Sequence, residues 1–112
     1  MAGPSKRIKR RFRECVAAAR EEELRRALHP VAEAVRRWER KELSSADLSE
    51  IIRRFDEGTA RKLWARYDTV PEMALAHAIT SGMLDRDTIP SEVLEHLAGP
   101  LRFYEEGETT RR

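Results

Sequence analysis

Apolar residues recur at intervals of three and four positions along most of the chain, which is the spacing of one face of an α-helix. A first stripe comprises Ile8, Phe12, Cys15 and Ala19, and a second comprises Leu24, Leu28, Val31, Val35 and Trp38. No segment alternates with the period of two that a half-buried strand requires. The sequence therefore predicts an all-α protein, a compact bundle of five or six short helices with a longer basic N-terminal helix.

The length of 112 residues fits one domain that can bury a core. We expect a single helical domain over residues 1–106, with a flexible start at 1–5 and a basic first helix at about 5–28. The polar segment 107–112 is expected to be a disordered tail.

Several residues mark where helices should begin or end. Pro30 lies inside the second stripe, where a proline removes a backbone donor and disturbs the preceding turn. Residues 21–42 therefore form either one kinked helix or two, and the pattern leaves both open. Ser44 or Ser45 can cap the next helix, and Gly58 suits a left-handed cap at its end.

The most apolar segment, residues 71–81, predicts a helix in the centre of the core. The longest uncharged stretch, residues 73–84, is too short to cross a bilayer, so we expect no membrane span. Cys15 is the single cysteine, so no intramolecular disulfide can form, and its place in an apolar stripe favours burial. We expect a small cytoplasmic protein.

The charged residues are unevenly distributed. All charged residues before Glu14 are basic, whereas the chain from Glu14 on holds 16 Lys and Arg against 20 Asp and Glu. The total of +2 thus combines a +6 end with a −4 body. On a helix the basic residues lie opposite Ile8 and Phe12, which fits a solvated face, a nucleic-acid-binding surface or a membrane-surface helix. The members of this basic cluster are Lys6, Arg7, Lys9, Arg10, Arg11 and Arg13.

A second basic group surrounds Gly58 and includes Arg61 and Lys62. Two short helices joined by a glycine turn have the arrangement of a helix-turn-helix, whose second helix contacts DNA. Arg61 and Lys62 therefore join the basic cluster as candidate nucleic-acid ligands. Asp56 and Glu57 oppose this interpretation, because they would face the phosphates.

Motifs for catalysis or metal binding are absent from the sequence, which has no glycine-rich phosphate loop, zinc-ligand spacing or nucleophile elbow. His77 and His96 hold matching positions in two predicted helices, and Glu92 lies one turn before His96. A metal-binding or enzymatic site would form if the two rings met. We favour structural roles for both histidines and expect no cofactor. A non-catalytic protein is favoured over an enzyme, and the enzymatic alternative stays open.

The sequence as a whole favours a non-catalytic protein-interaction or regulatory module. The apolar stripes resemble short coiled-coil seams, which would allow a homodimer. The candidate interface residues are Ile8, Phe12, Leu24, Val31 and Trp38. We therefore expect a protein partner or self-association. Nucleic-acid binding through the basic helix is the first alternative, and a site around His77 and His96 is the second.

Overall fold

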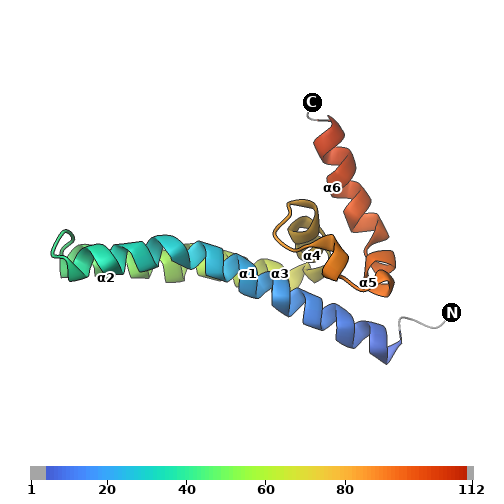
Figure 1. Ribbon diagram of the computed structural model, residues 1–112, viewed down its shortest axis with the longest axis horizontal. Helices are drawn as coiled ribbons and strands as arrows, with labels where there is room; N and C mark the ends of the chain where they lie inside the picture. The colour runs from blue at the N-terminus through green and yellow to red at the C-terminus, as the bar shows by residue number, and fades with distance from the viewer. Residues whose placement is uncertain (1–4, 111–112) are drawn as a thin grey trace.

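A long helical hairpin forms the larger part of the molecule (Figure 1). The computed structural model describes residues 5–110, with side chains up to residue 106. One side of the hairpin is α1 (Lys6–Glu39). The other side is an antiparallel helical run made of α2 (Ser45–Arg54), the π-helical η1 (Phe55–Ala60) and α3 (Arg61–Thr69).

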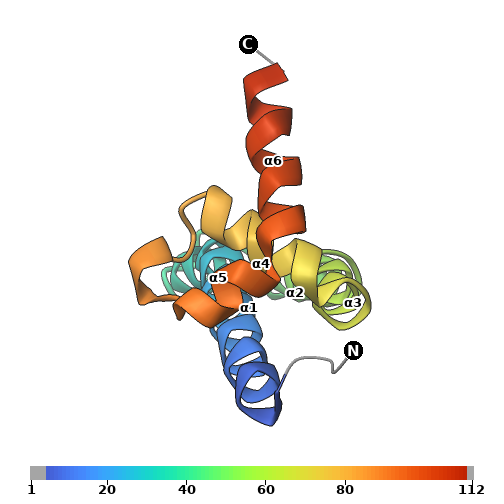
Figure 2. The same cartoon turned by 90° about the vertical axis from the view of Figure 1, so that its right-hand side faces the viewer.

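The remaining helices form a head at one end of the hairpin. They are α4 (Pro71–Thr80), the 3₁₀ turn η2 (Arg86–Thr88), α5 (Ser91–His96) and α6 (Ala98–Thr110). Figure 2 shows α6 rising from the head, away from the hairpin. The molecule measures 60 × 38 × 23 Å, because the hairpin extends well beyond the head. Residues 5–110 contain no strand, which confirms the predicted all-α fold with a longer N-terminal helix.

The first helix extends beyond the predicted range of about 5–28. Helix α1 ends at Glu39 and contains Pro30, so it is one helix rather than two. Pro30 is exposed, so the carbonyl of Arg26 that loses its backbone donor can be hydrated. Contacts with the antiparallel run lie on both sides of the proline, because Glu23 bonds Tyr67 of α3 and Trp38 bonds Ser45 of α2. Ser5 caps the helix, as its Oγ accepts a hydrogen bond from the backbone N–H of Ile8 at 3.2 Å.

The C-terminal helix also differs from the expectation. The predicted disordered tail covered residues 107–112, but α6 runs to Thr110, and residues 111–112 lie outside the described residues. Gly107 costs a helix about 1 kcal/mol relative to alanine, which weakens a helix without ending it. Pro100 lies in the first turn of α6, where its missing N–H is no loss. Of the predicted flexible start, residues 1–4 lie outside the described part.

The segment around Gly58 is the clearest departure from expectation. Gly58 does not end a helix, because α2 passes through η1 into α3 with right-handed helical dihedrals at Arg54 and Arg61. The helix-turn-helix interpretation is therefore wrong, since no turn separates the two helices. The apolar stripe that α2 begins reaches the half-buried Phe55 at the start of η1, and the stripe of α3 is preceded by the buried Ala60 at the end of η1, five residues later, with the half-buried Gly58 between them. A π turn closes its hydrogen bond over five residues, so it keeps both stripes on one side.

The main hydrophobic core lies in the head, around α4. Five of the ten residues of α4 are buried, which fits the central position that its composition predicted. Neighbouring helices surround it, and their buried contributions are Cys15, Val16 and Ala19 from α1, Leu63 and Tyr67 from α3, and Val93, Leu97 and Leu101 from the end of the chain. The predicted burial of Cys15 is confirmed, and this burial, together with the charge of Glu14, raises the pKa of the thiol.

A polar contact joins α1 to α3 where the hairpin meets the head. The carboxylate of Glu23 accepts a hydrogen bond from the Tyr67 hydroxyl at 2.9 Å and pairs with the guanidinium of Arg66. Burial and the bond to Glu23 raise the pKa of Tyr67 above its ordinary value. A buried hydroxyl without a partner is costly, so this contact fixes the register of α1 against α3.

Deleting Gly58 tests the role of the π turn. The five-residue step between Phe55 and Ala60 would become four, so η1 could become an α turn with Leu63 and Tyr67 still facing α1. We expect this deletion to change the free energy of unfolding by no more than about 1 kcal/mol. The matched control deletes the exposed Ala65, which turns Tyr67 by about 100° relative to Leu63. Chemical denaturation should show a loss of about 3 kcal/mol or more for this control, and equal losses in the two deletions would contradict the role given to η1.

Replacing Tyr67 by Phe tests the contact with Glu23. We expect the free energy of unfolding to fall by about 1.5 kcal/mol, the worth of a hydrogen bond to a charged acceptor. The parent should also lose stability above about pH 10, where tyrosine ionises in the unfolded chain while the raised pKa keeps folded Tyr67 protonated. The Phe variant has no hydroxyl to ionise at this position and lacks this loss. The difference in free energy of unfolding between the parent and the variant should therefore shrink as the pH rises above about 10. A deficit that stays constant in denaturation at neutral and alkaline pH would argue against the contact.

Candidate functional site

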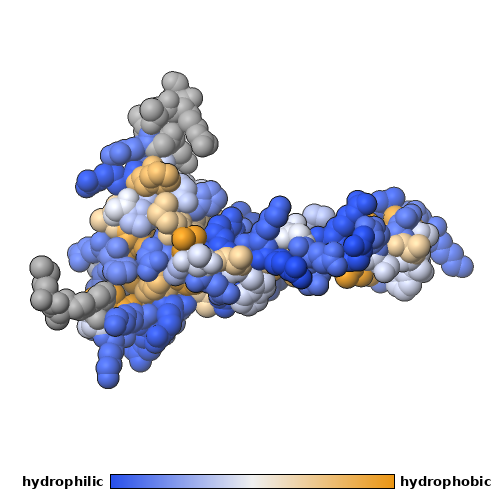
Figure 3. Space-filling view, turned by 180° about the vertical axis from the view of Figure 1, so that it is seen from behind, coloured by the Kyte–Doolittle hydropathy of each residue, from blue (hydrophilic) through white to orange (hydrophobic). Residues whose placement is uncertain are grey.

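Four large hydrophobic side chains of the hairpin are strongly exposed to solvent. Their exposed fractions are 43% for Leu28, 41% for Trp38, 46% for Ile52 and 44% for Trp64. Between residues 25 and 62, the buried residues are Ala34, Leu48 and Ala60. The outer hairpin therefore buries mainly small side chains and leaves its largest apolar ones outside. In Figure 3, patches of apolar surface break the otherwise hydrophilic hairpin.

These four side chains lie on one side of the hairpin. Successive residues of an α-helix are turned by about 100°, which places Leu28 and Trp38 about 120° and 40° from the buried Ala34. In the second run, Ile52 is turned by about 40° from the buried Leu48, and Trp64 by about 100° from the buried Leu63, in the same sense. In each run the buried residue marks the direction in which that run faces the other. Because the two runs are antiparallel, rotations in the same sense from these directions lead to the same side of the hairpin. We call this surface the apolar flank, defined by Leu28, Trp38, Ile52 and Trp64.

Both tryptophans of the apolar flank are held by neighbouring side chains. Trp38 donates a hydrogen bond from Nε1 to the Oγ of Ser45 at 2.9 Å, across the tip of the hairpin. The guanidinium of Arg20 lies 4.4 Å from the centre of the Trp64 ring, a cation–π contact between α1 and α3. The two rings are therefore fixed in position at the two ends of the flank.

The five predicted interface residues do not form one exposed surface, and Ile8 and Phe12 lie apart from the other three, nearer the N-terminal end of α1. Phe12 and Leu24 are half-buried against the core of the head, and Ile8 and Val31 are also half-buried. Trp38 is the only one of the five that is exposed as part of the apolar flank. Sequence reasoning did not select Ile52 and Trp64 as a pair, because a stripe does not show how much of its width a partner helix covers.

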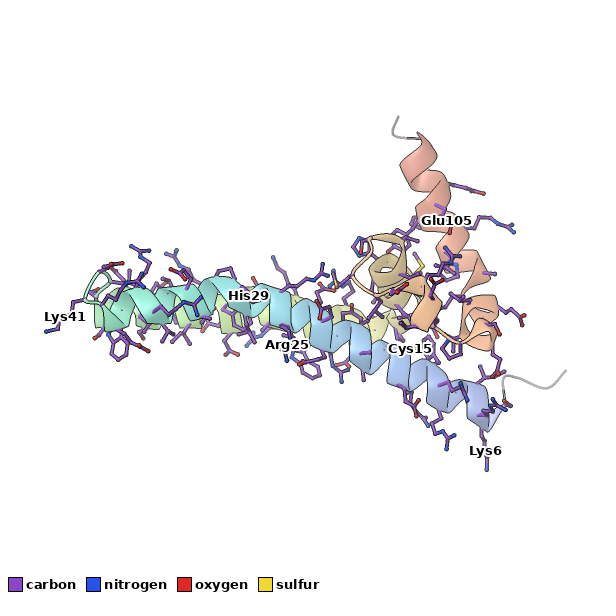
Figure 4. All side chains as sticks on the ribbon, viewed as in Figure 1. Lys6, Cys15, Arg25, His29, Lys41 and Glu105 are labelled. Carbon is purple, nitrogen blue, oxygen red and sulfur yellow. The ribbon has the colours of Figure 1, made fainter. Side chains whose placement is uncertain are left out.

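The basic cluster occupies the free end of α1. Figure 4 shows Lys6 at this end, directed away from the body of the molecule. Within the described residues its ion pairs are those of Arg7 with Glu92 at 3.6 Å and of Arg10 with Glu14 at 3.9 Å. Both pairs are long and exposed, so each contributes little.

Five of the six basic residues, all exposed on α1, form a shallow open cleft of about 470 Å³ between their own side chains, and these are Lys6, Arg7, Lys9, Arg10 and Arg13. Their like charges at i, i+4 disfavour the helix by about 0.2–0.5 kcal/mol a pair. The first turn has no acidic residue, so the positive charges also oppose the helix dipole. Arg11 differs from the rest, because it is half-buried and its Nε finds no hydrogen-bond partner in residues 5–106. The cluster is thus a concentrated positive surface kept at some cost to α1.

A smaller pocket of about 280 Å³ adjoins this cleft and shares Lys9 and Arg13 with it. Its other lining residues are Ile8, Phe12, Glu72 and His96, which come from α1, α4 and α5. The rings of Phe12 and His96 meet edge to face, with centroids 5.5 Å apart and planes inclined by 72°. Only the packing of the head on α1 brings these residues together, so sequence spacing could not reveal the pocket.

The candidate nucleic-acid ligands fall into two separate groups. Arg61 and Lys62 lie along the hairpin between the Trp38–Ser45 contact and the Tyr67–Glu23 contact. Arg13, the last basic residue of the cluster, precedes Glu23 by ten residues, or about 15 Å of helix. Arg61 and Lys62 are therefore not part of the surface at the end of α1.

The two histidines face different partners. The ring of His77 lies 5.2 Å from that of Tyr104 on α6, whereas His96 contacts Phe12 on α1. Glu92, the third proposed ligand, pairs with Arg7. In the part of the chain that the structure describes, no three His, Cys, Asp or Glu residues are grouped closely enough to hold a metal ion. The metal hypothesis thus finds no ligand set.

The chain was compared with known proteins at three levels. No protein-family model, no curated protein and no solved structure matches it. None of the described helices combines the length and apolar character needed to cross a membrane.

Proposed function

We propose that this protein is a helical interaction module whose partner is a second copy of the same chain. The observation that carries the proposal is the apolar flank, on which four large side chains are 41–46% exposed along one side of the hairpin. Apolar side chains gathered in this way are typical of contact surfaces. Two of the four are tryptophans, the residue type most enriched where interfaces gain their energy.

The stripe of α1 next to the flank favours antiparallel pairing with another α1. Its spacing of 4-3-4 is the same when it is read from either end, and its members are Leu24, Leu28, Val31 and Val35. A two-fold axis at the middle of the stripe places Leu24 of one copy opposite Val35 of the other, and Leu28 opposite Val31. Contacts between identical chains require this kind of self-complementary pattern.

The charges beyond the stripe fit the same pairing. Arg20 and Glu39 lie at equal distances along α1 from the midpoint of the stripe, so each Arg20 would approach the Glu39 of the other copy. Opposite charges at the two ends would attract and would set the register. The side of the hairpin that carries the apolar flank is about 27 Å long from Arg20 to Trp38, and two helices are about 20 Å wide. The projected area of about 540 Å² per copy approaches the roughly 800 Å² of accessible surface that each partner buries in a standard interface.

Sedimentation velocity over a range of concentrations tests self-association. We expect the parent to form a dimer and the double variant Leu28→Glu/Ile52→Glu to stay a monomer, because it places charges in the apolar contact. The matched control Ala18→Glu/Ala65→Glu adds the same charge at exposed positions on the outer side of the hairpin and should dimerise like the parent. A parent that stays monomeric at high micromolar concentration would overturn the proposal.

A charge exchange tests the antiparallel register. We expect Arg20→Glu and Glu39→Arg each to weaken the dimer about tenfold, because each places like charges opposite one another at both ends of the contact. The double variant should recover most of the parental affinity, although it still lacks the Arg20 contact with the Trp64 ring. Circular dichroism checks that every variant stays helical. A double variant no better than the singles would exclude this register.

A further inference from the structure

We infer that the basic end of α1 and the pocket beside it form a binding site for single-stranded nucleic acid. This site is separate from the apolar flank and does not depend on the proposed self-association. It combines the cationic cleft, which would hold phosphates, with a pocket that contains two aromatic rings, which would hold a base. The pocket residues that carry the argument are Phe12, Glu72 and His96.

The cleft has the chemistry of a phosphate site. Every residue that lines it is a lysine or an arginine. Lys6, Lys9 and Arg13 form no ion pair within the described residues, and the pairs of Arg7 and Arg10 are long and exposed. Phosphates would therefore displace almost no existing contact. They would also relieve the repulsion among these cations and the conflict with the helix dipole.

The adjoining pocket suits the uncharged part of the same ligand. The carboxylate of Glu72 at its wall would repel a phosphate, whereas the rings of Phe12 and His96 offer faces on which a flat base can stack. Its volume of about 280 Å³ leaves room for one planar ring system. Lys9 and Arg13 line both cavities, so a base and its own phosphate could be bound side by side.

This combination favours a single strand over other polyanions. In a duplex the bases are stacked and paired, so none can enter a pocket beside the phosphate site. A membrane surface or an acidic peptide would satisfy the cations but has no regular planar group for the Phe12–His96 corner. Single-stranded nucleic acid has both parts in each repeating unit.

Glu72 gives the site a preference among bases. A carboxylate accepts hydrogen bonds, and cytosine presents an amino group at the position where thymine and uracil present a carbonyl oxygen. We therefore expect cytosine to be bound more tightly than thymine or uracil. The variant Glu72→Gln, whose amide both donates and accepts, should lose this preference.

Fluorescence anisotropy with labelled oligo(dC), oligo(dT) and the corresponding RNA strands tests the inference. We expect oligo(dC) or oligo(rC) to bind at low salt with an affinity about tenfold higher than that of the corresponding thymine or uracil strand. This difference in affinity should disappear in Glu72→Gln. Affinity should fall steeply between about 50 and 200 mM salt, and Lys6→Gln/Lys9→Gln/Arg13→Gln should reduce the slope of log affinity against log salt by about two. His96→Ala, an exposed position, and Phe12→Leu, which retains an apolar side chain, should each weaken binding about tenfold without changing the salt slope.

Three outcomes would overturn the inference. The first is duplex DNA, or vesicles of anionic lipid, binding as tightly as the single strand. The second is a loss of affinity in Arg61→Gln/Lys62→Gln as large as that in Lys6→Gln/Lys9→Gln/Arg13→Gln. Arg61 and Lys62 lie outside the site, so such a loss would indicate general attraction to positive charge. The third is no detectable binding of either cytosine strand at about 50 mM salt.

Discussion

The π turn of η1 is the constraint on which the arrangement of the molecule depends. Helix α2 faces α1 through Leu48, and α3 faces it through Leu63 and Tyr67, so the two stripes must lie on one side of a continuous helical run. With the same residues in ordinary α turns, the stripe of α3 would be rotated away from α1. Tyr67 would then lose its hydrogen bond to Glu23, and the polar contact between α1 and α3 would be absent.

The head and the hairpin differ in how much of their apolar side chains they bury. Around α4 the chain gathers large side chains such as Leu75, Val93 and Leu97 into a core from which solvent is excluded. The outer hairpin has only two layers of helix, and beyond the head it buries little more than Ala34 and Leu48. Its many surface ion pairs contribute little each, so they do not replace a core. A hairpin of this kind has the most to gain from a further layer of helix, which is the physical basis of the proposed contact.

Features of the structure that depend on local spacing were predicted correctly from the sequence. Features that depend on contacts between distant segments were not. The 3-and-4 spacing of apolar residues correctly indicated an all-α protein, and Ser44 caps α2 as expected, its Oγ accepting from the N–H of Asp47 at 3.0 Å. The prediction of a helix end at Gly58 was wrong, because a glycine is compatible both with a helix end and with a helix interior. Only the five-residue step from Phe55 to Ala60 distinguishes the two cases. The Phe12–His96 corner depends on how the head packs on α1, which no local pattern encodes.

The uneven charge that marks the sequence bears on the geometry of the proposed dimer. The middle of the basic cluster lies about twenty residues, or about 30 Å, from the midpoint of the α1 stripe. Antiparallel pairing would hold the two basic ends about 60 Å apart, far beyond the screening length of about 8–10 Å in physiological salt, so they would not repel one another. Parallel pairing would place the two clusters side by side with no acidic residue before Glu14 to neutralise them. The cluster that would bind a polyanion thus also opposes the parallel arrangement, and it leaves both ends of an antiparallel dimer free for a ligand.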